Sequence, residues 1–381
     1  MAHRNIICAM LAFGDSGIGN IAYSEDILAT LDCANALNAS IGKESDSLRI
    51  TGIQGVPGKR EMDFPCRESG STMRFFMGIA MALGLKAKFF GSDTLLHRPF
   101  QVYEEICGKQ GILFERHEDH ILIDGKLHPD TFEIPGNISS QFISGLLFGL
   151  PLLEKESMIR LIPPVESRSY IALTIQSLSD FGVKIETNGD MLKIPGNQKY
   201  KAANLSVEGD YSNAAFPEAL NLFGGEVSVT GLLPDSAQGD KVYRSHFESL
   251  QQENAKIDLT DCPDLAPVLF AVSACMHGGD FTGTKRLAMK ESDRGRVMCE
   301  ELAKCGVKTE TEENRIRILP SKVHAPFEPL CGHNDHRIVM ALSVLLTQTG
   351  GMITGAEAVR KSYPDFFDDL RRLGIKFDLL N

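Results

Sequence analysis

The stretch Cys299-Glu-Glu-Leu-Ala-Lys-Cys-Gly306-Val-Lys-Thr309 shows the pattern that decides the fold. Its first part has the mixed apolar and charged residues of an amphipathic helix, and its last part reads as a short β-strand. The glycine between them lies where a helix needs a left-handed residue before a strand can begin. The segment therefore predicts a helix, a glycine cap and a strand, in that order.

The same pattern recurs along the chain. The other copies read Tyr103-Glu-Glu-Ile-Cys to Gly111-Ile-Leu-Phe, Ile175-Gln-Ser-Leu to Gly182-Val-Lys-Ile, Phe247-Glu-Ser-Leu to Ala255-Lys-Ile, and Phe367-Asp-Asp-Leu to Gly374-Ile-Lys-Phe. Ala255 takes the place of glycine in one copy, and residues 26–37 resemble a sixth. Such recurrence is typical of proteins built from repeated supersecondary units.

Each unit also contains a second, more apolar helix. These helices are predicted at residues 71–83, 141–150, 214–223, 265–276 and 337–346. Because they are apolar nearly all round, we expect them in the interior. Six units of about 50 to 73 residues, each with two helices and several short strands, predict an α/β repeat protein. The alternative is six unrelated segments in a three-layer domain, and the regular spacing favours the repeat.

Length and composition limit the class of protein. The chain has 381 residues, of which 43% are hydrophobic, and a formal net charge of -11. Two cores are expected at this length. The negative charge argues against general binding to nucleic acid or to a membrane surface. Because nine cysteines show no metal-ligand spacing and no signal-like or membrane-spanning stretch is evident, we expect a cytoplasmic protein without a bound metal.

Polar residues gather just before the predicted apolar helices. These starts read His3-Arg4, Ser69-Gly70-Ser71-Thr72, Ser139-Ser140-Gln141, Asp210-Tyr211-Ser212-Asn213, Asp264 and Asp335-His336-Arg337. A helix N-terminus offers free N–H groups and partial positive charge, so it is suited to anions. Ser, Asp and Asn are also the usual N-caps, so each start taken singly is explained by capping.

Arginines are harder to explain by capping. Arg4, Arg74 and Arg337 lie inside or beside apolar helices, where a guanidinium needs a partner such as a carboxylate or a phosphate. Four further groups are open to two readings, as ligand contacts or as solvated helix faces and surface turns. They are Lys290-Glu291-Ser292-Asp293-Arg294, Lys361-Ser-Tyr-Pro364, Arg98-Pro99 and Ser167-Arg168-Ser169-Tyr170.

These motifs resemble those of the 5-enolpyruvylshikimate-3-phosphate (EPSP) synthases across essentially the whole chain. Glu68-Ser-Gly-Ser-Thr-Met-Arg74 looks like the family's phosphoenolpyruvate loop, and Ser139-Ser-Gln141 like its shikimate 3-phosphate motif. Lys290 to Arg294, Asn334-Asp-His-Arg337 and Lys361 to Pro364 follow in the family's order. The resemblance implies an inside-out α/β barrel and a monomer. Its two similar domains, residues 1–207 and 208–381, would each hold three βαβαββ-type repeats, with buried helices pointing their N-termini toward the interdomain cleft.

The resemblance also implies a reaction. The enolpyruvyl (carboxyvinyl) group of phosphoenolpyruvate moves to the 5-hydroxyl of shikimate 3-phosphate with release of phosphate, in chorismate biosynthesis, without metal or cofactor. Asp264 would take the hydroxyl proton and Glu291 would serve the methylene carbon. Phosphoenolpyruvate would be bound by Gly70, Arg98, Arg294, His336, Arg337 and Lys361. Shikimate 3-phosphate would be bound by Arg4, Ser139, Ser140, Gln141, Ser167, Tyr170, Asp264 and Lys290.

The start of the sequence departs from the family. Members read a lysine and a serine closely before the stretch that resembles Ala2-His3-Arg4, whereas this sequence starts at Met1. Losing one such contact costs about 10² to 10³ in rate, so little activity is expected of the chain as written. The extra N-terminal strand of the second domain is expected to be absent, and a misplaced start is the favoured explanation.

Two other functions compete with this reading. One is a catalytically inactive homologue that binds shikimate 3-phosphate or a protein partner. The other is a UDP-N-acetylglucosamine enolpyruvyl transferase, which uses a cysteine in a mobile loop. The corresponding stretch, residues 91–98, has no cysteine, and Cys107 lies in the following predicted helix. The sequence thus favours the EPSP synthase reading.

Overall fold

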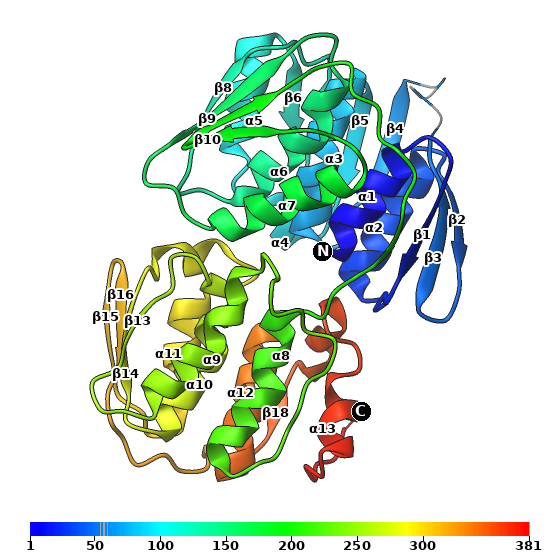
Figure 1. The fold of residues 1–381 in the computed structure, drawn as a ribbon. Coiled ribbons are helices and arrows are strands. Elements are labelled where there is room, and N and C mark those ends of the chain that lie inside the picture. Colours follow the sequence, from blue (N-terminus) through cyan, green and yellow to red (C-terminus); the bar gives the residue numbers. More distant parts are fainter. Residues whose placement is uncertain (54, 56–57, 59, 381) are drawn as a thin grey trace. The chain divides into compact units, whose positions relative to one another are not determined.

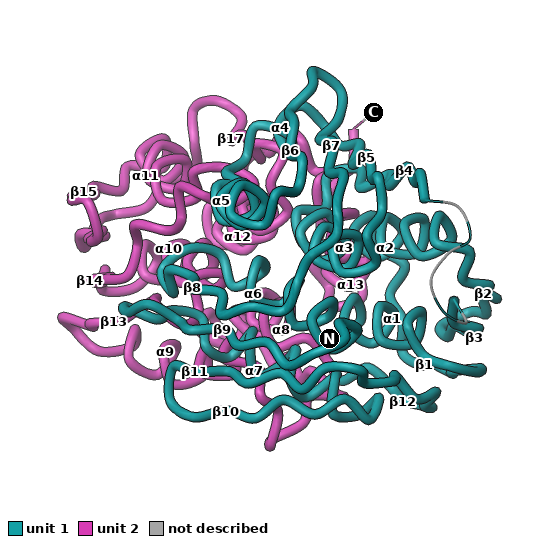
Figure 2. Tube along the Cα trace, turned by 90° about the horizontal axis from the view of Figure 1, so that it is seen from above, with its two compact units in different colours: residues 1–208 teal, residues 209–381 magenta. Residues whose placement is uncertain are grey.

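The computed structural model describes residues 1–53, 55, 58 and 60–380. The chain divides into two compact units, Met1–Glu208 and Gly209–Asn381. Figure 1 shows the helices and strands along the chain, and Figure 2 colours the two units separately. Each unit has its own hydrophobic core.

Unit 1 contains three four-stranded sheets with the same strand order. The strand orders are β4-β5-β7-β6, β8-β9-β11-β10 and β12-β1-β3-β2. In each order the first two strands pair in parallel, and the later neighbours pair antiparallel. The strands are β1 (Asp15–Gly19), β2 (Ser40–Lys43), β3 (Ser47–Thr51), β4 (Glu61–Pro65), β5 (Lys86–Phe90), β6 (Leu113–Arg116), β7 (His120–Asp124), β8 (Thr131–Pro135), β9 (Ser157–Ile162), β10 (Glu186–Asn188), β11 (Met191–Ile194) and β12 (Asn204–Ser206).

Two main helices accompany each sheet of unit 1. They are α1 (Ala2–Leu11), α2 (Glu25–Ala36), α3 (Gly70–Leu83), α5 (Gln101–Gln110), α6 (Ser140–Gly149) and α7 (Arg168–Asp180), with a short α4 (Asp93–Leu96) and the 3-10 turn η1 (Leu150–Leu152). The second and third copies therefore run βαβαββ along the chain. The first copy takes its outer strand from the end of the unit, because β12 pairs in parallel with β1.

Glycines let the two most buried helices of unit 1 touch. A Cβ on Gly78 of α3 would lie 2.2 Å from the carbonyl oxygen of Gly145 on α6, and a Cβ on Gly145 would lie 2.4 Å from the carbonyl oxygen of Arg74. Only glycine permits such a close approach of two backbones. The contact fixes α3 against α6 and thereby brings their polar first turns together.

Unit 2 repeats the pattern less completely. Its sheet β13-β14-β16-β15 has the same order, and β17-β18 forms a separate parallel pair. The strands are β13 (Lys256–Asp258), β14 (Gly279–Thr282), β15 (Thr309–Glu312), β16 (Arg315–Ile318), β17 (Leu330–Cys331) and β18 (Ile353–Thr354). The helices are α8 (Tyr211–Glu218), α9 (Tyr243–Leu250), α10 (Ala266–Cys275), α11 (Arg294–Lys304), α12 (His336–Thr349) and α13 (Phe366–Arg372). The 3-10 turns are η2 (Ala219–Phe223), η3 (Gly239–Val242), η4 (Pro263–Leu265), η5 (Lys285–Met289) and η6 (Ala356–Lys361).

The full set of strands occurs in four of the six copies within the described residues. Around α8 and α9, residues 209–255, all of them described, form no strand, although the sequence pattern predicts several. The connection from Gly224 to Gln238 contains three glycines and one proline, which disfavour strands. The helix predicted over residues 214–223 is α-helical only as far as Glu218. Because α8 contains Pro217, the chain continues from Ala219 as the 3-10 turn η2.

The predicted glycine caps are confirmed. Gly111 directly follows α5, whereas one residue separates α7, α11 and α13 from the glycines that follow them. The φ values of Gly111, Gly182, Gly306 and Gly374 are 69°, 77°, 82° and 89°. The prediction for Ala255 is wrong, because Asn254 holds the left-handed position with φ 59°. Asparagine tolerates this region better than alanine does.

No helix in the part of the chain that the structure describes is long and apolar enough to cross a membrane. All nine cysteines are free thiols.

Candidate active site

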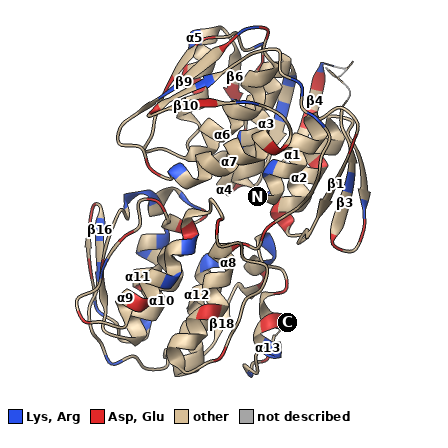
Figure 3. Ribbon diagram, in the orientation of Figure 1, with Lys and Arg blue, Asp and Glu red and all other residues tan. Residues whose placement is uncertain are grey.

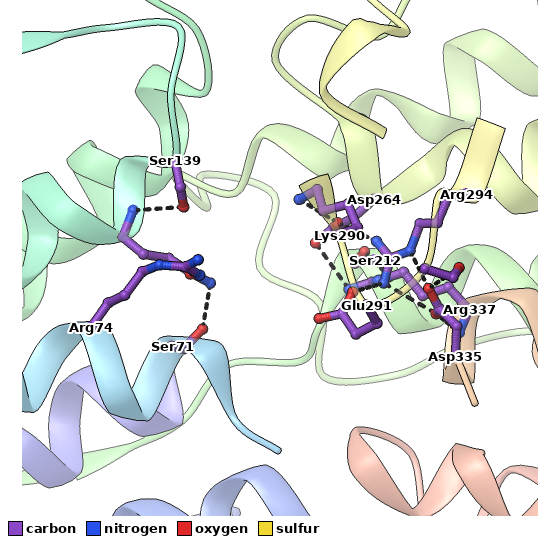
Figure 4. A network of polar contacts seen from close by, with 12 residues as sticks. Ser71, Arg74, Ser139, Ser212, Asp264, Lys290, Glu291, Arg294, Asp335 and Arg337 are labelled. Atoms are coloured by element: carbon purple, nitrogen blue, oxygen red, sulfur yellow. Dashed lines mark hydrogen bonds and ion pairs between the residues drawn. The ribbon is translucent and has the colours of Figure 1, made fainter. Parts of the chain in front are cut away.

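The first turns of α3 and α6 form one polar cluster in unit 1. The guanidinium of Arg74 donates from Nη1 to Oε1 of Gln141 at 2.6 Å, and Nε2 of Gln141 donates to Oγ of Ser71 at 2.8 Å (Figure 4). Ser139 caps α6 by accepting from the backbone N–H of Gln141. Arg74 is buried and lies 5.1 and 5.0 Å from the ring centroids of Phe100 and Phe142, which hold its plane.

Two arginines converge above Gly70, the first residue of α3. A Cβ at Gly70 would lie 2.7 Å from Nη1 of Arg98 and 3.1 Å from Nη1 of Arg74. The N-cap Ser69 accepts from the backbone N–H of Thr72, so the free end of α3 is well ordered. A helix N-terminus beside two guanidiniums is a strong anion site.

Arg4 connects α1 with α7 in the same unit. Its Nε donates to Oγ1 of Thr174 at 2.8 Å and its Nη2 to the carbonyl oxygen of Tyr170 at 3.2 Å. Burial lowers the pKa of Arg4 to about 10, which still leaves it charged near neutral pH. Ser167, the N-cap residue of α7, is buried with a left-handed φ of 56°.

In unit 2 the buried Arg294 is the centre of a charged network (Figure 4). Its Nε donates to Oδ2 of Asp335 at 2.8 Å, its Nη1 to Oδ1 of Asp264 at 2.8 Å, and its Nη2 to Oε2 of Glu291 at 2.5 Å. Figure 3 shows the mixture of acidic and basic residues around α10, α11 and α12. Three carboxylates from three segments thus surround one guanidinium, which satisfies most of its donors.

Asp264 contacts two cations besides Arg294. Lys290 Nζ lies 3.0 Å from its Oδ1, and Arg337 Nη2 lies 3.2 Å from its Oδ2. Burial alone would raise the pKa of Asp264, but the charges of Arg337, Lys290 and Arg294 outweigh it and hold the pKa well below the ordinary value. Asp264 is therefore ionised at neutral pH.

The remaining predicted residues of unit 2 lie next to this network. Arg337 Nη1 donates to Oγ of Ser212 at 2.5 Å, and Lys361 Nζ donates to the carbonyl oxygen of Asn334 at 2.6 Å. Burial lowers the pKa of Lys290, although the charge of Asp264 opposes the shift. Burial also lowers the pKa of His336 to about 4, so its imidazole is neutral at pH 7.

The structure brings some of the predicted residues together within each unit. Within unit 1 the contacts join Arg4 to the backbone of Tyr170 and Ser139 to Gln141. Within unit 2 they join Asp264, Lys290, Glu291, Arg294 and Arg337. Among the described residues, no group of three or more His, Cys, Asp or Glu is arranged to hold a metal ion.

Sequence reasoning missed the roles of several partners. The sequence places Asp335 at a helix start and in the motif Asn334-Asp-His-Arg337 without a role of its own, yet it binds Arg294 through both carboxylate oxygens. Ser212 and Ser71 also stood at helix starts, and they accept hydrogen bonds from Arg337 and Gln141. A helix start is visible in sequence, whereas the long-range partner of its polar side chain is not.

Solved structures resemble this fold. The chain matches the EPSP synthase of Acinetobacter baumannii with a TM-score of 0.77 and 23% sequence identity, covering 98% of this chain and 93% of that one. It matches the enolpyruvyl transferase NikO from Streptomyces tendae with a TM-score of 0.74 and 13% identity, over the same shares of the two chains. At these identities the likeness concerns the fold, and it agrees with the predicted α/β architecture.

Sequence relatives are closer. The 3-phosphoshikimate 1-carboxyvinyltransferase of Clostridioides difficile strain 630 is 38% identical over 413 residues, which span all of this chain and 94% of the relative. The enzyme of the same name from Clostridium perfringens strain ATCC 13124 is 38% identical over 98% of this chain and 93% of its own length. The family model for EPSP synthase (3-phosphoshikimate 1-carboxyvinyltransferase) matches residues 1–370. The chain therefore belongs to the EPSP synthase family.

Proposed function

We propose that this chain transfers the enolpyruvyl group of phosphoenolpyruvate to the 5-hydroxyl of shikimate 3-phosphate and releases phosphate. Family membership supports this reaction. The observation that carries the chemistry is the ionised Asp264 held among Lys290, Arg294 and Arg337. The comparisons do not bear out the expected low activity, the inactive homologue or the UDP-N-acetylglucosamine transferase.

Asp264 is proposed to take the proton of the 5-hydroxyl. A general base must be unprotonated and within reach of its proton, and the lowered pKa of Asp264 satisfies the first condition. A carboxylate with a lowered pKa is a weak base, so the reaction also needs stabilisation of the oxygen that loses the proton. Lys290, whose Nζ lies 3.0 Å from Asp264, is placed to supply that positive charge.

Glu291 is proposed to serve the methylene carbon of phosphoenolpyruvate. That carbon must gain a proton when the hydroxyl oxygen bonds to its neighbour, and it must lose one when phosphate leaves. Glu291 and Asp264 share Arg294 as a partner, since Nη2 and Nη1 of that guanidinium bind the two carboxylates. One rigid cation thereby fixes the spacing of the two proposed proton carriers.

Phosphoenolpyruvate is proposed to bind mainly through cationic side chains. Its phosphate and carboxylate suit the forked geometry of guanidinium groups and the point charge of lysine. The proposed contacts are Gly70, Arg98, Arg294, His336, Arg337 and Lys361. The two arginines above Gly70 support this assignment for the N-terminus of α3, and Arg74 is added to it on the same geometry.

Shikimate 3-phosphate is proposed to bind through the first turns of α1, α6 and α7. The proposed contacts are Arg4, Ser139, Ser140, Gln141, Ser167 and Tyr170, together with Asp264 and Lys290. Ser139 and Ser140 begin α6, where free N–H groups and hydroxyls suit a phosphate. We further propose three repeats in each of residues 1–207 and 208–381, a monomer, and a cytoplasmic location.

Phosphate release tests the proposed function. The full chain is mixed with both substrates, and inorganic phosphate is measured over time, with each single substrate as a control. Release that needs both substrates is expected. Absence of release, or release from phosphoenolpyruvate alone, would overturn the proposal.

A further inference from the structure

The loop between β17 and α12 has an uncommon backbone conformation. His333 and Asn334 are consecutive non-glycine residues in the left-handed region, with φ values of 49° and 51°. Such residues persist only where the surrounding structure holds them. The loop ends at Asp335, which caps α12 by accepting from the backbone N–H of Arg337.

Helix α11 holds this loop at both ends. Arg294 binds Asp335 at the end nearest α12. Glu301 lies seven residues further along α11, so it projects from the same face of the helix. Its Oε2 accepts from the backbone N–H of Cys331 at 2.8 Å, and its Oε1 lies 2.9 Å from Nε2 of His333.

The loop in turn positions three of the proposed phosphoenolpyruvate contacts. The carbonyl oxygen of Asn334 accepts a 2.6 Å hydrogen bond from Nζ of Lys361. His336 and Arg337 follow Asp335 directly, as the first residues of α12. A change in the backbone at residues 333 and 334 would therefore shift the Lys361 anchor and the start of α12 together.

We propose that Glu301 is a positioning residue for phosphoenolpyruvate, acting through His333 and the loop from Cys331 to Asp335. Its carboxylate is 2% exposed and touches none of the proposed substrate contacts directly. The inference rests on the proposed assignment of Lys361 and Arg337 to phosphoenolpyruvate. The competing role is purely structural, because Glu301 also pairs with Lys304 at 3.1 Å on its own helix.

Glu301→Gln separates the two roles. Glutamine keeps the size of the side chain and an oxygen acceptor for Cys331, but it has no second oxygen to contact Nε2 of His333. We expect KM for phosphoenolpyruvate to rise by up to roughly 100-fold, with KM for shikimate 3-phosphate little changed, because misplacement of remote groups can cost that much. His333→Asn tests the same link from the loop, because asparagine tolerates the left-handed backbone and the side chain there is partly exposed.

Glu300→Gln is the matched control. Glu300 neighbours Glu301 on α11 but is exposed and pairs with Arg296, so both KM values should stay unchanged.

The affinity for phosphoenolpyruvate alone is also measured by calorimetry, which needs no turnover. Weaker binding of phosphoenolpyruvate in both variants, with no further loss in the double variant, would support the coupling. A lower Tm with unchanged affinity, or equal losses for the two substrates, would overturn it. Absence of phosphate release by the unsubstituted chain would count against the proposed function, and the calorimetric comparison would still decide the role of Glu301.

Discussion

Arg294 donates to both carboxylate oxygens of Asp335, at 2.8 Å from Nε and 3.2 Å from Nη2. Both side chains are buried, with 1% and 0% of their surfaces exposed. Burial alone would raise the pKa of Asp335, but the charge of Arg294 outweighs it and keeps that pKa below the ordinary value. Because Asp335 also caps α12, the pair joins the start of α11 to the start of α12.

Asp335→Asn should therefore destabilise the protein strongly. The substitution leaves the buried guanidinium of Arg294 without its main counter-charge, and breaking a buried pair costs about 3–5 kcal/mol. Urea unfolding at pH 7 measures the loss. The exposed pair of Arg160 and Glu133 gives the comparison, since Glu133→Gln should cost at most about 1 kcal/mol. Equal effects of the two substitutions would contradict the structural importance of the buried pair.

Asp264→Asn should abolish most turnover, and it should also lower stability because it removes the carboxylate shared by Lys290, Arg294 and Arg337. Loss of a general base commonly lowers kcat by about 10² to 10⁴. The pKa of Asp264 is lowered by its cations, so in the unsubstituted enzyme it stays ionised as pH falls toward its ordinary range. Any loss of activity between pH 7 and 5 should then come from another group. Steady-state phosphate release across this range is the measurement. Asp258 accepts from the backbone N–H and the hydroxyl of Thr260, and Asp258→Asn keeps an oxygen acceptor for both, so that variant should stay active.

Gly70→Ala should weaken phosphoenolpyruvate binding without weakening the fold. The new methyl group would lie 2.7 Å from Nη1 of Arg98 and 3.1 Å from Nη1 of Arg74, so the guanidinium ends of both arginines must shift. Reducing the freedom of the unfolded chain by replacing glycine is worth about 0.4–1 kcal/mol in stability. We expect a higher KM for phosphoenolpyruvate with an equal or higher Tm. Gly108→Ala on α5, where nothing lies within 4 Å of the new Cβ, should leave KM unchanged; a KM shift in that control would show that the Gly70 result is not local.

Local signals in the sequence predicted the parts of the fold that depend on one segment. The glycines at 111, 182, 306 and 374 were identified correctly because a left-handed cap is a property of the chain around it. Asn254 was missed because its neighbour Ala255 aligned with those glycines, and the sequence does not tell which of two adjacent residues changes its backbone. The pairing of Asp335 with Arg294 joins residues 41 positions apart, so it depends on the packing of α11 against the loop, which no local pattern reports.

Stability should fall in mild acid because of His336. Burial lowers its pKa from 6.5 to about 4, so between these values the unfolded chain binds a proton that the folded chain does not. The stability contributed by the neutral form of His336 is fully present above pH 6.5 and is lost as pH falls through 4. The resulting loss in the free energy of unfolding is about 3 kcal/mol at most.

Urea unfolding midpoints at pH 7.5 and pH 5 measure this loss. They are compared for the unsubstituted chain, for His336→Asn and for His97→Asn, which alters an exposed histidine of the turn after α4. The urea midpoint of His336→Asn should fall less between these two pH values than that of the unsubstituted chain. Some dependence on pH should remain, because burial also lowers the pKa of His3, to about 3. Identical slopes in all three proteins would mean that His336 takes up its proton without unfolding.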